Sequence, residues 1–269
     1  MSSIGIMGGG WLGLALAEKA IVRNHSIKVS TTRKEKSTLL KKKGINAAIV
    51  DVSEFDISGD IDFFNDLNHL IISIPPGLRK NPDHNYIAVI GRIINKIELT
   101  GIEKVIFTSS TSVYGNQSEI ITEESELLGT TAAARQIIAV EKNLLEHKQF
   151  ESCILRLGGL VGPNRHPIFT LSGKKNIPNP LSPINFIHQQ DAVNIILHII
   201  ENWQGKQVYN AVTPFHPTRI DYYSEMAKIA ALEAPAFEKS GIIKGIVSAK
   251  KVRKDLNFKF LVKNLLILN

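Results

Sequence analysis

The sequence contains a single cysteine, so the chain cannot form an internal disulfide. Cys153 lies in an apolar run typical of a strand, and we expect a buried, unreactive thiol. No stretch approaches the roughly 18 consecutive apolar residues of a membrane-spanning helix, and no basic region followed by a long apolar stretch opens the chain. We expect a soluble, cytoplasmic protein without a metal site.

Charge of one sign is in excess but is not concentrated. Lys and Arg number 32 against 25 Asp and Glu, which gives a formal charge of +7. The two basic clusters, residues 41–43 and 250–254, are typical of solvated helix faces, and no aromatic stripe accompanies them. We therefore expect a small-molecule partner rather than nucleic acid or a membrane. The sequence leaves the oligomeric state open, and a homodimer is compatible with it.

Short apolar runs alternate with helical periodicity along most of the chain, and this alternation is typical of a parallel sheet covered on both faces. We predict an α/β fold of the Rossmann type, with a doubly wound parallel sheet. The predicted strands are Ile4–Met7, Ile27–Ser30, Ala47–Val50, Leu70–Ile74, Val105–Thr108, Cys153–Leu157 and Gln207–Asn210, and the predicted helices are Trp11–Val22, Lys34–Lys43, Tyr86–Leu99, Ala132–Leu145 and Ala192–Ile200.

Two segments interrupt the alternation. Residues 163–185 are rich in proline and lack periodicity, and residues 214–269 show one helix candidate near Asp221–Leu232. We predict that they form a small lobe at the carboxyl edge of the sheet, where ligands of open α/β folds bind. Residues 1–162 and 186–213 would then form the Rossmann domain. So small a lobe favours a small substrate.

A glycine-rich turn follows the first predicted strand. Residues 8–13 read G-G-G-W-L-G and open the first predicted helix. Gly8 permits a tight turn, Gly10 lets backbone N–H groups approach a pyrophosphate, and Gly13 lets the helix pack closely on the strand. Trp11 and Leu12 begin that helix, whose N-terminus favours a phosphate. Because a strand precedes the glycines and a helix follows them, the pattern indicates a dinucleotide-binding site.

The residues after the second predicted strand bear on which dinucleotide binds. NAD sites usually place Asp or Glu about twenty residues past the glycines, against the ribose 2′-hydroxyl. Here the segment Ser30–Lys34 reads S-T-T-R-K and holds no carboxylate. Arg33, with Thr32 beside it, can pair with the 2′-phosphate of NADP(H), or it can simply begin a solvated helix. The sequence favours NADP(H) and remains compatible with NAD(H).

Further cofactor contacts are expected where the next two predicted strands end. Asp51 can accept a hydrogen bond from the adenine amino group, or it can cap a turn. Ile74 and Pro75 can contact a ribose of the cofactor, although the Pro-Pro-Gly sequence is also an ordinary turn.

Three later segments resemble the extended short-chain dehydrogenase/reductase superfamily, in that family's order. They read FTSSTSVYG at residues 107–115, LRLGGLVGPNR at 155–165 and NFIHQQDA at 185–192. With the glycine-rich turn and VYN at 208–210, the resemblance covers roughly residues 4–210 and is similar to the NAD-dependent epimerases and dehydratases, nearest to an atypical subgroup. It implies a nicotinamide cofactor.

The resemblance also implies roles for individual residues. Ser110 corresponds to the serine that hydrogen-bonds the reacting oxygen, and Ser109 and Gly158 line the nicotinamide end of the site. Arg165 and His166 resemble positions that face the substrate, where an arginine commonly holds phosphate.

The predicted helix Ala132–Leu145 departs from the family. The family carries Y-x-x-x-K there, whose lysine lowers the pKa of the tyrosine so that it can exchange a proton as hydride moves. Aligning Glu141 with the family's usual glutamate places Ala133 and Ile137 at those positions. No Tyr is followed four residues later by Lys anywhere in the sequence. Cofactor binding therefore does not by itself establish turnover.

Four side chains are candidate substitutes for the missing tyrosine, and each also has a structural interpretation. They are Tyr114, Arg135, His166 and His188, of which we assign Tyr114 and His188 with Ser110 to catalysis. The sequence thus predicts an NADP(H)-dependent oxidoreductase or epimerase-like protein acting on a small polar substrate. The alternative is a non-catalytic NADP(H)-binding sensor or scaffold.

Overall fold

The structure is a computed structural model that describes residues 1–268. Its core is an eight-stranded sheet of order β10-β7-β6-β5-β1-β2-β3-β4, in which all strands but β4 run parallel. This topology confirms the predicted Rossmann-type fold. The strands are β1 (Ser3–Met7), β2 (Ser26–Thr31), β3 (Asn46–Val52), β4 (Ile57–Gly59), β5 (His69–Ile72), β6 (Lys104–Ser110), β7 (Glu151–Leu157) and β10 (Gln207–Ala211), with β8 (Gly159–Val161) and β9 (Phe186–His188) pairing separately.

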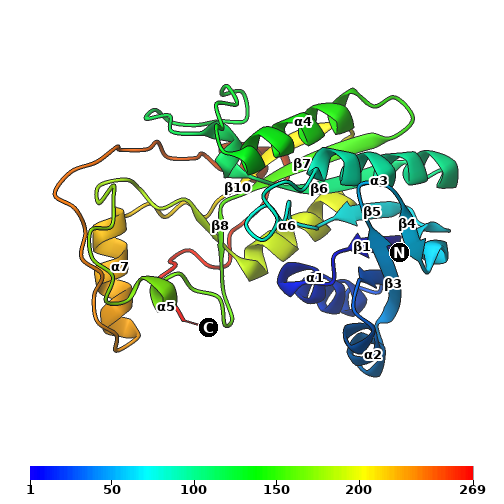
Figure 1. Ribbon diagram of the computed structural model, residues 1–269, viewed down its shortest axis with the longest axis horizontal. Coiled ribbons are helices and arrows are strands. Elements are labelled where there is room, and N and C mark those ends of the chain that lie inside the picture. Colours follow the sequence, from blue (N-terminus) through cyan, green and yellow to red (C-terminus); the bar gives the residue numbers. More distant parts are fainter. Residues whose placement is uncertain (269) are drawn as a thin grey trace.

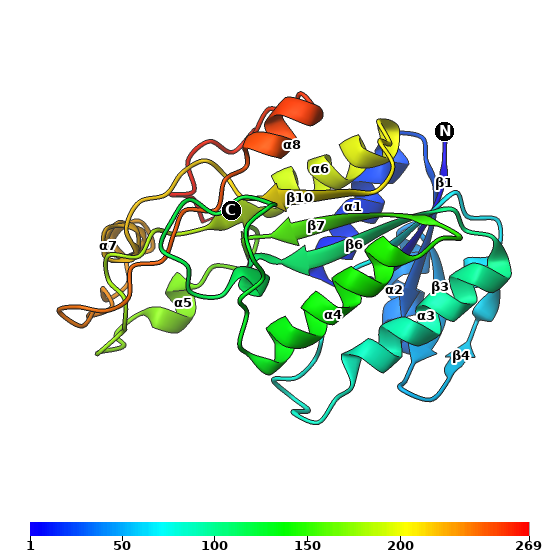
Figure 2. The same ribbon diagram turned by 90° about the horizontal axis from the view of Figure 1, so that it is seen from above.

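Helices cover both faces of the sheet (Figures 1 and 2). The apolar side chains of α1, α2, α6 and α8 share one core with one face, and those of α3 and α4 share a second core with the other. The helices are α1 (Trp11–Val22), α2 (Lys34–Lys42), α3 (Tyr86–Thr100), α4 (Ala132–Glu146), α5 (Ile168–Leu171), α6 (Gln189–Glu201), α7 (Arg219–Ile229) and α8 (Lys250–Asp255), with 3-10 turns η1 (Ile61–Phe64) and η2 (Thr111–Tyr114).

Local sequence explains where the main elements begin and end. The side chain of Asn85 accepts the N–H of Ala88 at 3.0 Å and begins α3, which ends at Gly101 with a φ of 69°. Thr131 begins α4 in the same way, by accepting the N–H of Ala134 at 3.1 Å. The unpredicted elements β4, β8, β9 and α5 hold only three or four residues each, too few to show a period.

A third apolar cluster forms the lobe at the carboxyl end of the sheet, around α5, α7 and residues 262–268 (Figure 1). The segment 214–269, predicted to lie wholly in the lobe, is divided. Val252, Leu256, Phe258 and Phe260 pack into the main core instead, because α8 lies against β10. No helix within residues 1–268 combines the length and apolar character needed to cross a membrane.

Candidate functional site

The turn between β1 and α1 has the geometry that its glycines require. Gly8 has a φ of 102°, in the left-handed region that favours glycine. A Cβ on Gly13 would lie 2.1 Å from the carbonyl oxygen of Gly8, so the helix can approach the turn only because Gly13 has no side chain. An added Cβ on Gly10 would meet no described atom within 4 Å. The space above Gly10 is therefore open to a ligand.

The start of α1 offers backbone donors to that space. The N–H of Gly9 donates to the carbonyl of Ser30 at 2.8 Å, and this bond fixes the turn to β2. Within residues 1–268 no side chain caps α1, which begins at Trp11, so the first N–H groups of the helix point to solvent or ligand. Such an N-terminus favours an anion.

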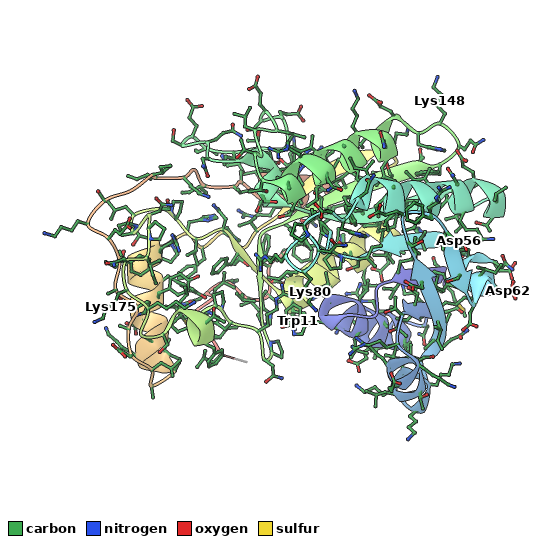
Figure 3. The ribbon with its side chains drawn as sticks, in the orientation of Figure 1. Trp11, Asp56, Asp62, Lys80, Lys148 and Lys175 are labelled. Atoms are coloured by element: carbon green, nitrogen blue, oxygen red, sulfur yellow. The ribbon has the colours of Figure 1, made fainter. Side chains whose placement is uncertain are left out.

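Trp11 connects this turn to the segment after β8. Its indole Nε1 donates to the carbonyl of Pro163 at 2.8 Å, and the guanidinium of Arg165 lies over its ring at 5.0 Å from the centroid. Figure 3 labels Trp11 near the middle of the molecule, between the sheet domain and the lobe. The predicted cofactor residue Trp11 and the predicted substrate residue Arg165 are thus brought together.

A cavity of about 310 Å³ extends from the glycine turn along the carboxyl ends of β2, β3 and β5. Most of the predicted cofactor residues line it, namely Gly8, Gly10, Thr32, Arg33, Asp51, Ile74 and Pro75. The lining also includes residues that were not predicted from the sequence, among them Lys36, His84 and Tyr86. Lys36 alone carried a signal, because it follows Arg33 by three residues and so shares a helix face with it.

One end of the cavity is basic. Arg33 and Lys36 both line it, and within residues 1–268 neither forms an ion pair with a carboxylate. Burial, and then the positive charge of Arg33, lower the pKa of the Lys36 ammonium. Thr31 Oγ1 accepts the N–H of Arg33 at 3.3 Å and holds the backbone at the start of α2. An anion beside these two side chains would offset their mutual repulsion.

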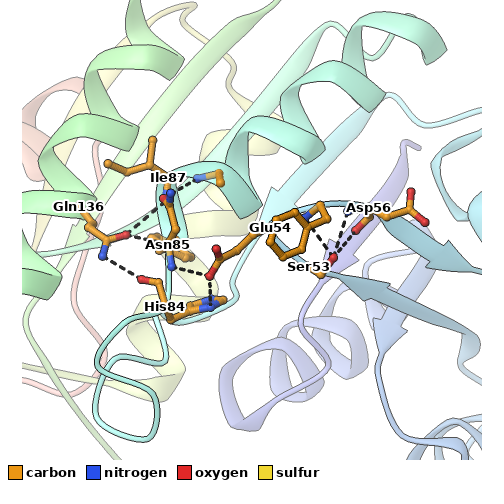
Figure 4. A network of polar contacts seen from close by, with 10 residues as sticks. Ser53, Glu54, Asp56, His84, Asn85, Ile87 and Gln136 are labelled. Carbon is orange, nitrogen blue, oxygen red and sulfur yellow. Dashed lines mark hydrogen bonds and ion pairs between the residues drawn. The ribbon is translucent and has the colours of Figure 1, made fainter.

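Another part of the lining, at His84 and Tyr86, is fixed by a polar network (Figure 4). The amide of Gln136, on α4, accepts the N–H of Tyr86 at 2.6 Å and donates to the carbonyl of His84 at 3.0 Å. The ring Nδ1 of His84 lies 3.3 Å from the Glu54 carboxylate, and the hydroxyl of Tyr86 donates to the carbonyl of Ile74 at 2.8 Å. Both ends of the loop 75–85 are therefore held in place.

Two serines at the end of β6, Ser109 and Ser110, differ in their exposure and in their hydrogen bonds. Ser110 is partly exposed, and its Oγ accepts the N–H of Ser112 at 3.1 Å, which leaves its own hydroxyl proton for another acceptor. Ser109 is buried and donates to the Glu141 carboxylate. At Gly158 an added Cβ would lie 2.6 Å from the carbonyl oxygen of Asn185, so the backbone passes closely there. Of the two, Ser110 is the serine with the more exposed side chain, and neither serine lines the cavity.

Tyr114, predicted to be catalytic, is fully buried and does not line the cavity. Its hydroxyl donates to Asn210 Oδ1 at 2.7 Å and accepts from Arg156 at 2.9 Å. Arg156 also pairs with Glu141 at 2.7 Å. Burial raises the pKa of Tyr114, with the positive charge of Arg156 acting against it. The structure therefore places Tyr114 in a buried network and not at the site.

The two predicted site histidines are buried, and Nε2 of His188 has no hydrogen-bond partner among the described residues. His188 is buried, accepts the N–H of Gln190 at Nδ1 and so caps α6, while its Nε2 lies close to Gly162. His166 is buried, and its Nε2 lies 2.7 Å from the hydroxyl of Tyr222 on α7. Burial lowers the pKa of His166 to about 4, so its ring is neutral at pH 7. Neither histidine lines the cavity.

At the positions of the family's tyrosine and lysine, the structure places two apolar side chains that are at least partly buried. Ala133 is half-buried and Ile137 is buried on the inner side of α4. Arg135, two residues from each, is exposed and donates to the carbonyl of Thr130 at its own helix start. Among the described residues, no side chain of α4 therefore supplies a proton donor at the position of the family's tyrosine.

The sequence matches the NAD dependent epimerase/dehydratase family over residues 4–211. The chain belongs to this family. The match confirms the resemblance inferred from the sequence, and it gives a nicotinamide dinucleotide as the class of cofactor. The glycine cradle fits such a cofactor, because the space that a Cβ on Gly10 would enter is free and the cavity beside it continues toward Arg33.

Individual relatives are similar over nearly their whole length. Protein YeeZ of Escherichia coli K12 is 30% identical over 264 residues, which cover 97% of this chain and 96% of the relative. A conserved protein of unknown function from Silicibacter pomeroyi has a TM-score of 0.81 at 18% identity, covering 98% and 95% of the two chains. MoeE5, solved with UDP-glucuronic acid and NAD, has a TM-score of 0.79 at 16% identity, covering 98% and 96%.

Proposed function

We propose that this chain is an NADP(H)-dependent oxidoreductase or epimerase-like enzyme that acts on a small polar substrate. The observation that carries the proposal is the basic end of the cavity, where Arg33 and Lys36 lie without a carboxylate partner among the described residues. A 2′-phosphate is the group of NADP(H) that NAD(H) lacks, and guanidinium and ammonium groups bind phosphate by charge-assisted hydrogen bonds. This arrangement supports NADP(H) over NAD(H).

Residues along the cavity would each bind one part of the cofactor. The turn at Gly8 and Gly10, with the first N–H groups of α1, would hold the pyrophosphate, and Arg33 and Lys36 would hold the 2′-phosphate. Asp51 would accept from the adenine amino group. When bound, the cofactor supplies or accepts hydride.

Ser110 would orient the substrate. Its hydroxyl proton is available, so it can donate a hydrogen bond to a carbonyl oxygen and stabilise the negative charge that develops there. The apolar Ala133 and Ile137 supply no proton in place of the family's tyrosine. We therefore propose a substrate whose oxygen or nitrogen needs little help from an acid, such as an activated carbonyl or a protonated imine.

Binding titrations test the cofactor assignment. Wild-type protein should bind NADPH more tightly than NADH, and Arg33→Asp should reverse that order because the new carboxylate repels a 2′-phosphate and accepts from a 2′-hydroxyl. Lys34→Asp is the matched control, because Lys34 is exposed and does not line the cavity. Unchanged relative affinities in Arg33→Asp, measured by calorimetry, would refute the assignment of Arg33.

The second candidate function is a non-catalytic NADP(H) sensor or scaffold. The apolar pair Ala133 and Ile137 favours it, because the usual acid/base group is absent from α4. Turnover assays with NADPH and a panel of activated carbonyls and imines separate the two functions. An enzyme should oxidise NADPH in a way that depends on Ser110, whereas a sensor should bind NADPH and turn over none of these compounds.

A further inference from the structure

His84 lines the cofactor cavity, but two side chains from other segments hold it there. Its ring Nδ1 lies 3.3 Å from the Glu54 carboxylate, and its backbone carbonyl accepts from the amide of Gln136 at 3.0 Å (Figure 4). An ionised carboxylate only accepts hydrogen bonds, so Nδ1 carries the hydrogen of this contact. Within residues 1–268 the other ring nitrogen, Nε2, forms no hydrogen bond, and it is therefore available to a ligand.

The same two side chains hold the beginning of α3, directly after His84. Glu54 Oε1 accepts the N–H of Asn85 at 2.7 Å. Gln136 Oε1 accepts the N–H of Tyr86 at 2.6 Å and that of the next residue at 3.3 Å. The first N–H groups of a helix have no partner within the helix. Glu54 and Gln136 supply those partners here, and they fix the backbone on both sides of the bond between His84 and Asn85.

The neighbouring lining residue Tyr86 has further support. Its side chain is 1% exposed and packs in the apolar core, and its hydroxyl donates to the carbonyl of Ile74 at 2.8 Å. His84 is only half-buried, and its hydrogen bonds to other segments of residues 1–268 are those with Glu54 and Gln136. Loss of either partner should therefore disturb the position of His84 more than that of Tyr86.

Gln136 lies on α4 directly before Ile137, which stands at the position of the family's lysine. Neither Gln136 nor Glu54 lines the cavity, so an effect on a ligand there would pass through the residues that they hold. We propose that Gln136 and Glu54 are positioning residues for the cofactor, and that they act by holding His84 in the cavity wall. The inference rests on the proposed function, because it needs a dinucleotide in that cavity. A side chain that is already fixed loses less entropy when it binds a ligand.

A double-mutant cycle tests this inference. Calorimetry would measure the Kd of NADPH for wild type, Gln136→Met, His84→Ala and the variant that combines both changes. Methionine keeps the length of glutamine and lacks its amide. Gln190→Met is the matched control, because Gln190 is an exposed glutamine on α6 and does not line the cavity. Thermal unfolding of each variant would show that it is folded.

Gln136→Met should weaken NADPH binding about 3- to 10-fold when His84 is present, the range expected for one lost hydrogen bond. In the His84→Ala background the same change should weaken NADPH less than about 2-fold, because no ring remains to be positioned. Gln190→Met should leave the Kd as in wild type. A merely structural role of Gln136 would weaken NADPH equally in the two backgrounds.

Glu54 gives a second test that does not depend on how α4 tolerates a substitution. Glu54→Gln keeps an oxygen that can accept from His84 and Asn85, whereas Glu54→Met keeps none. Glu54→Met should weaken NADPH binding about 3- to 10-fold, and Glu54→Gln should bind NADPH about 3-fold or more tightly than Glu54→Met.

Equal weakening by Gln136→Met in the two backgrounds, or unchanged NADPH affinity in either Gln136→Met or Glu54→Met, would overturn this inference and leave the proposed cofactor in place. Failure of wild type to bind NADPH would instead overturn the proposed function.

Discussion

The proposed cofactor site has two halves, the cavity beside the glycine turn and the region at the end of β6, and their polar groups are used differently. In the half around Arg33, Lys36 and Asp51 the side chains line an open cavity. In the half around Ser109, the side chains bond to one another, because Ser109, Arg156 and Glu141 form a buried cluster. Groups that face a cavity are available to a ligand, and groups that satisfy each other hold the fold. The first half therefore has polar groups free for a ligand, and most polar groups of the second half hold the fold.

The buried cluster connects four elements of the sheet domain. Ser109 lies on β6, Glu141 on α4, Arg156 on β7 and Asn210 on β10, and the hydroxyl of Tyr114 joins the last two. The Glu141–Arg156 pair is only 2–4% exposed, so each charge depends on its partner. Ser110 follows Ser109 at the end of β6, and its Oγ accepts the N–H of Ser112.

The largest expected effect is a loss of stability when the buried cluster of the second half is broken. Arg156→Met should lower the free energy of unfolding by about 3–5 kcal/mol, because Glu141 is left as an unpaired buried charge. Urea denaturation measures this change. Arg33→Met, on the binding half, should alter stability by no more than about 0.5 kcal/mol. If the two variants lost equal stability, the division between a rigid half and a binding half would be wrong.

Sequence reasoning predicted the sheet well because its inner strands are buried on both faces. Ile4, Ile71 and Ile106 lie on three neighbouring parallel strands and are almost wholly inaccessible, so each strand reads as a continuous apolar run. The glycine turn was also predictable, since Gly8 has a left-handed φ and Gly13 packs against the backbone of Gly8. These features depend on neighbours in the sequence.

The rest of the site depends on contacts between distant residues. His84 lines the cavity through bonds to Glu54 and Gln136, respectively 30 and 52 residues away, and no local pattern marks it. The hydrogen bonds that withdraw Tyr114 and His166 from the site likewise come from remote segments. Sequence alone offers a polar side chain as a candidate but does not show whether another side chain already satisfies it.

The second largest effect should fall on the binding of both dinucleotides. Gly10→Val should weaken NADPH and NADH by about 100-fold or more, because the side chain enters the space above the turn where pyrophosphate binds. Stability should change little, since a Cβ at Gly10 meets no described atom within 4 Å. Gly91→Val is the control, with similarly open space on α3. A folded Gly10→Val protein with normal affinity, measured by calorimetry, would disprove the loop geometry.

A third change would test the comparison by placing a proton donor in the rigid half. Ala133→Tyr with Ile137→Lys should raise the rate of NADPH-dependent reduction of isatin, an activated ketone, by about 10-fold, a part of the 10²–10⁴-fold that a positioned proton donor contributes. Adding Ser110→Ala should remove the gain. Because Ile137→Lys replaces a buried apolar side chain, the single variant Ala133→Tyr serves as a version that leaves Ile137 in place.

The matched control for that experiment is Ala133→Phe with Ile137→Lys, which has the ring and the ammonium but no hydroxyl. An equal gain with phenylalanine would show that packing, and not proton transfer, explains the rate. Rapid wild-type turnover of a nucleotide-sugar that is insensitive to Ser110→Ala would show that the reaction does not rely on the Ser110 hydroxyl.

The smallest expected effect concerns Lys36, the second cation of the proposed 2′-phosphate site. Lys36→Met should weaken NADPH binding about 3- to 10-fold and leave NADH within about 2-fold, because a partly exposed cation contributes modestly and is screened by salt. Lys36→Arg should restore NADPH affinity, since it keeps the charge.

The lowered pKa of Lys36 also predicts that NADPH should raise it, so NADPH binding should take up protons at alkaline pH. Calorimetry in buffers of different ionisation enthalpy measures that uptake, which should vanish in Lys36→Met. If Lys36→Met weakened NADPH and NADH equally, Lys36 would contact a part that the two cofactors share, and Arg33 alone would remain as the group that distinguishes them.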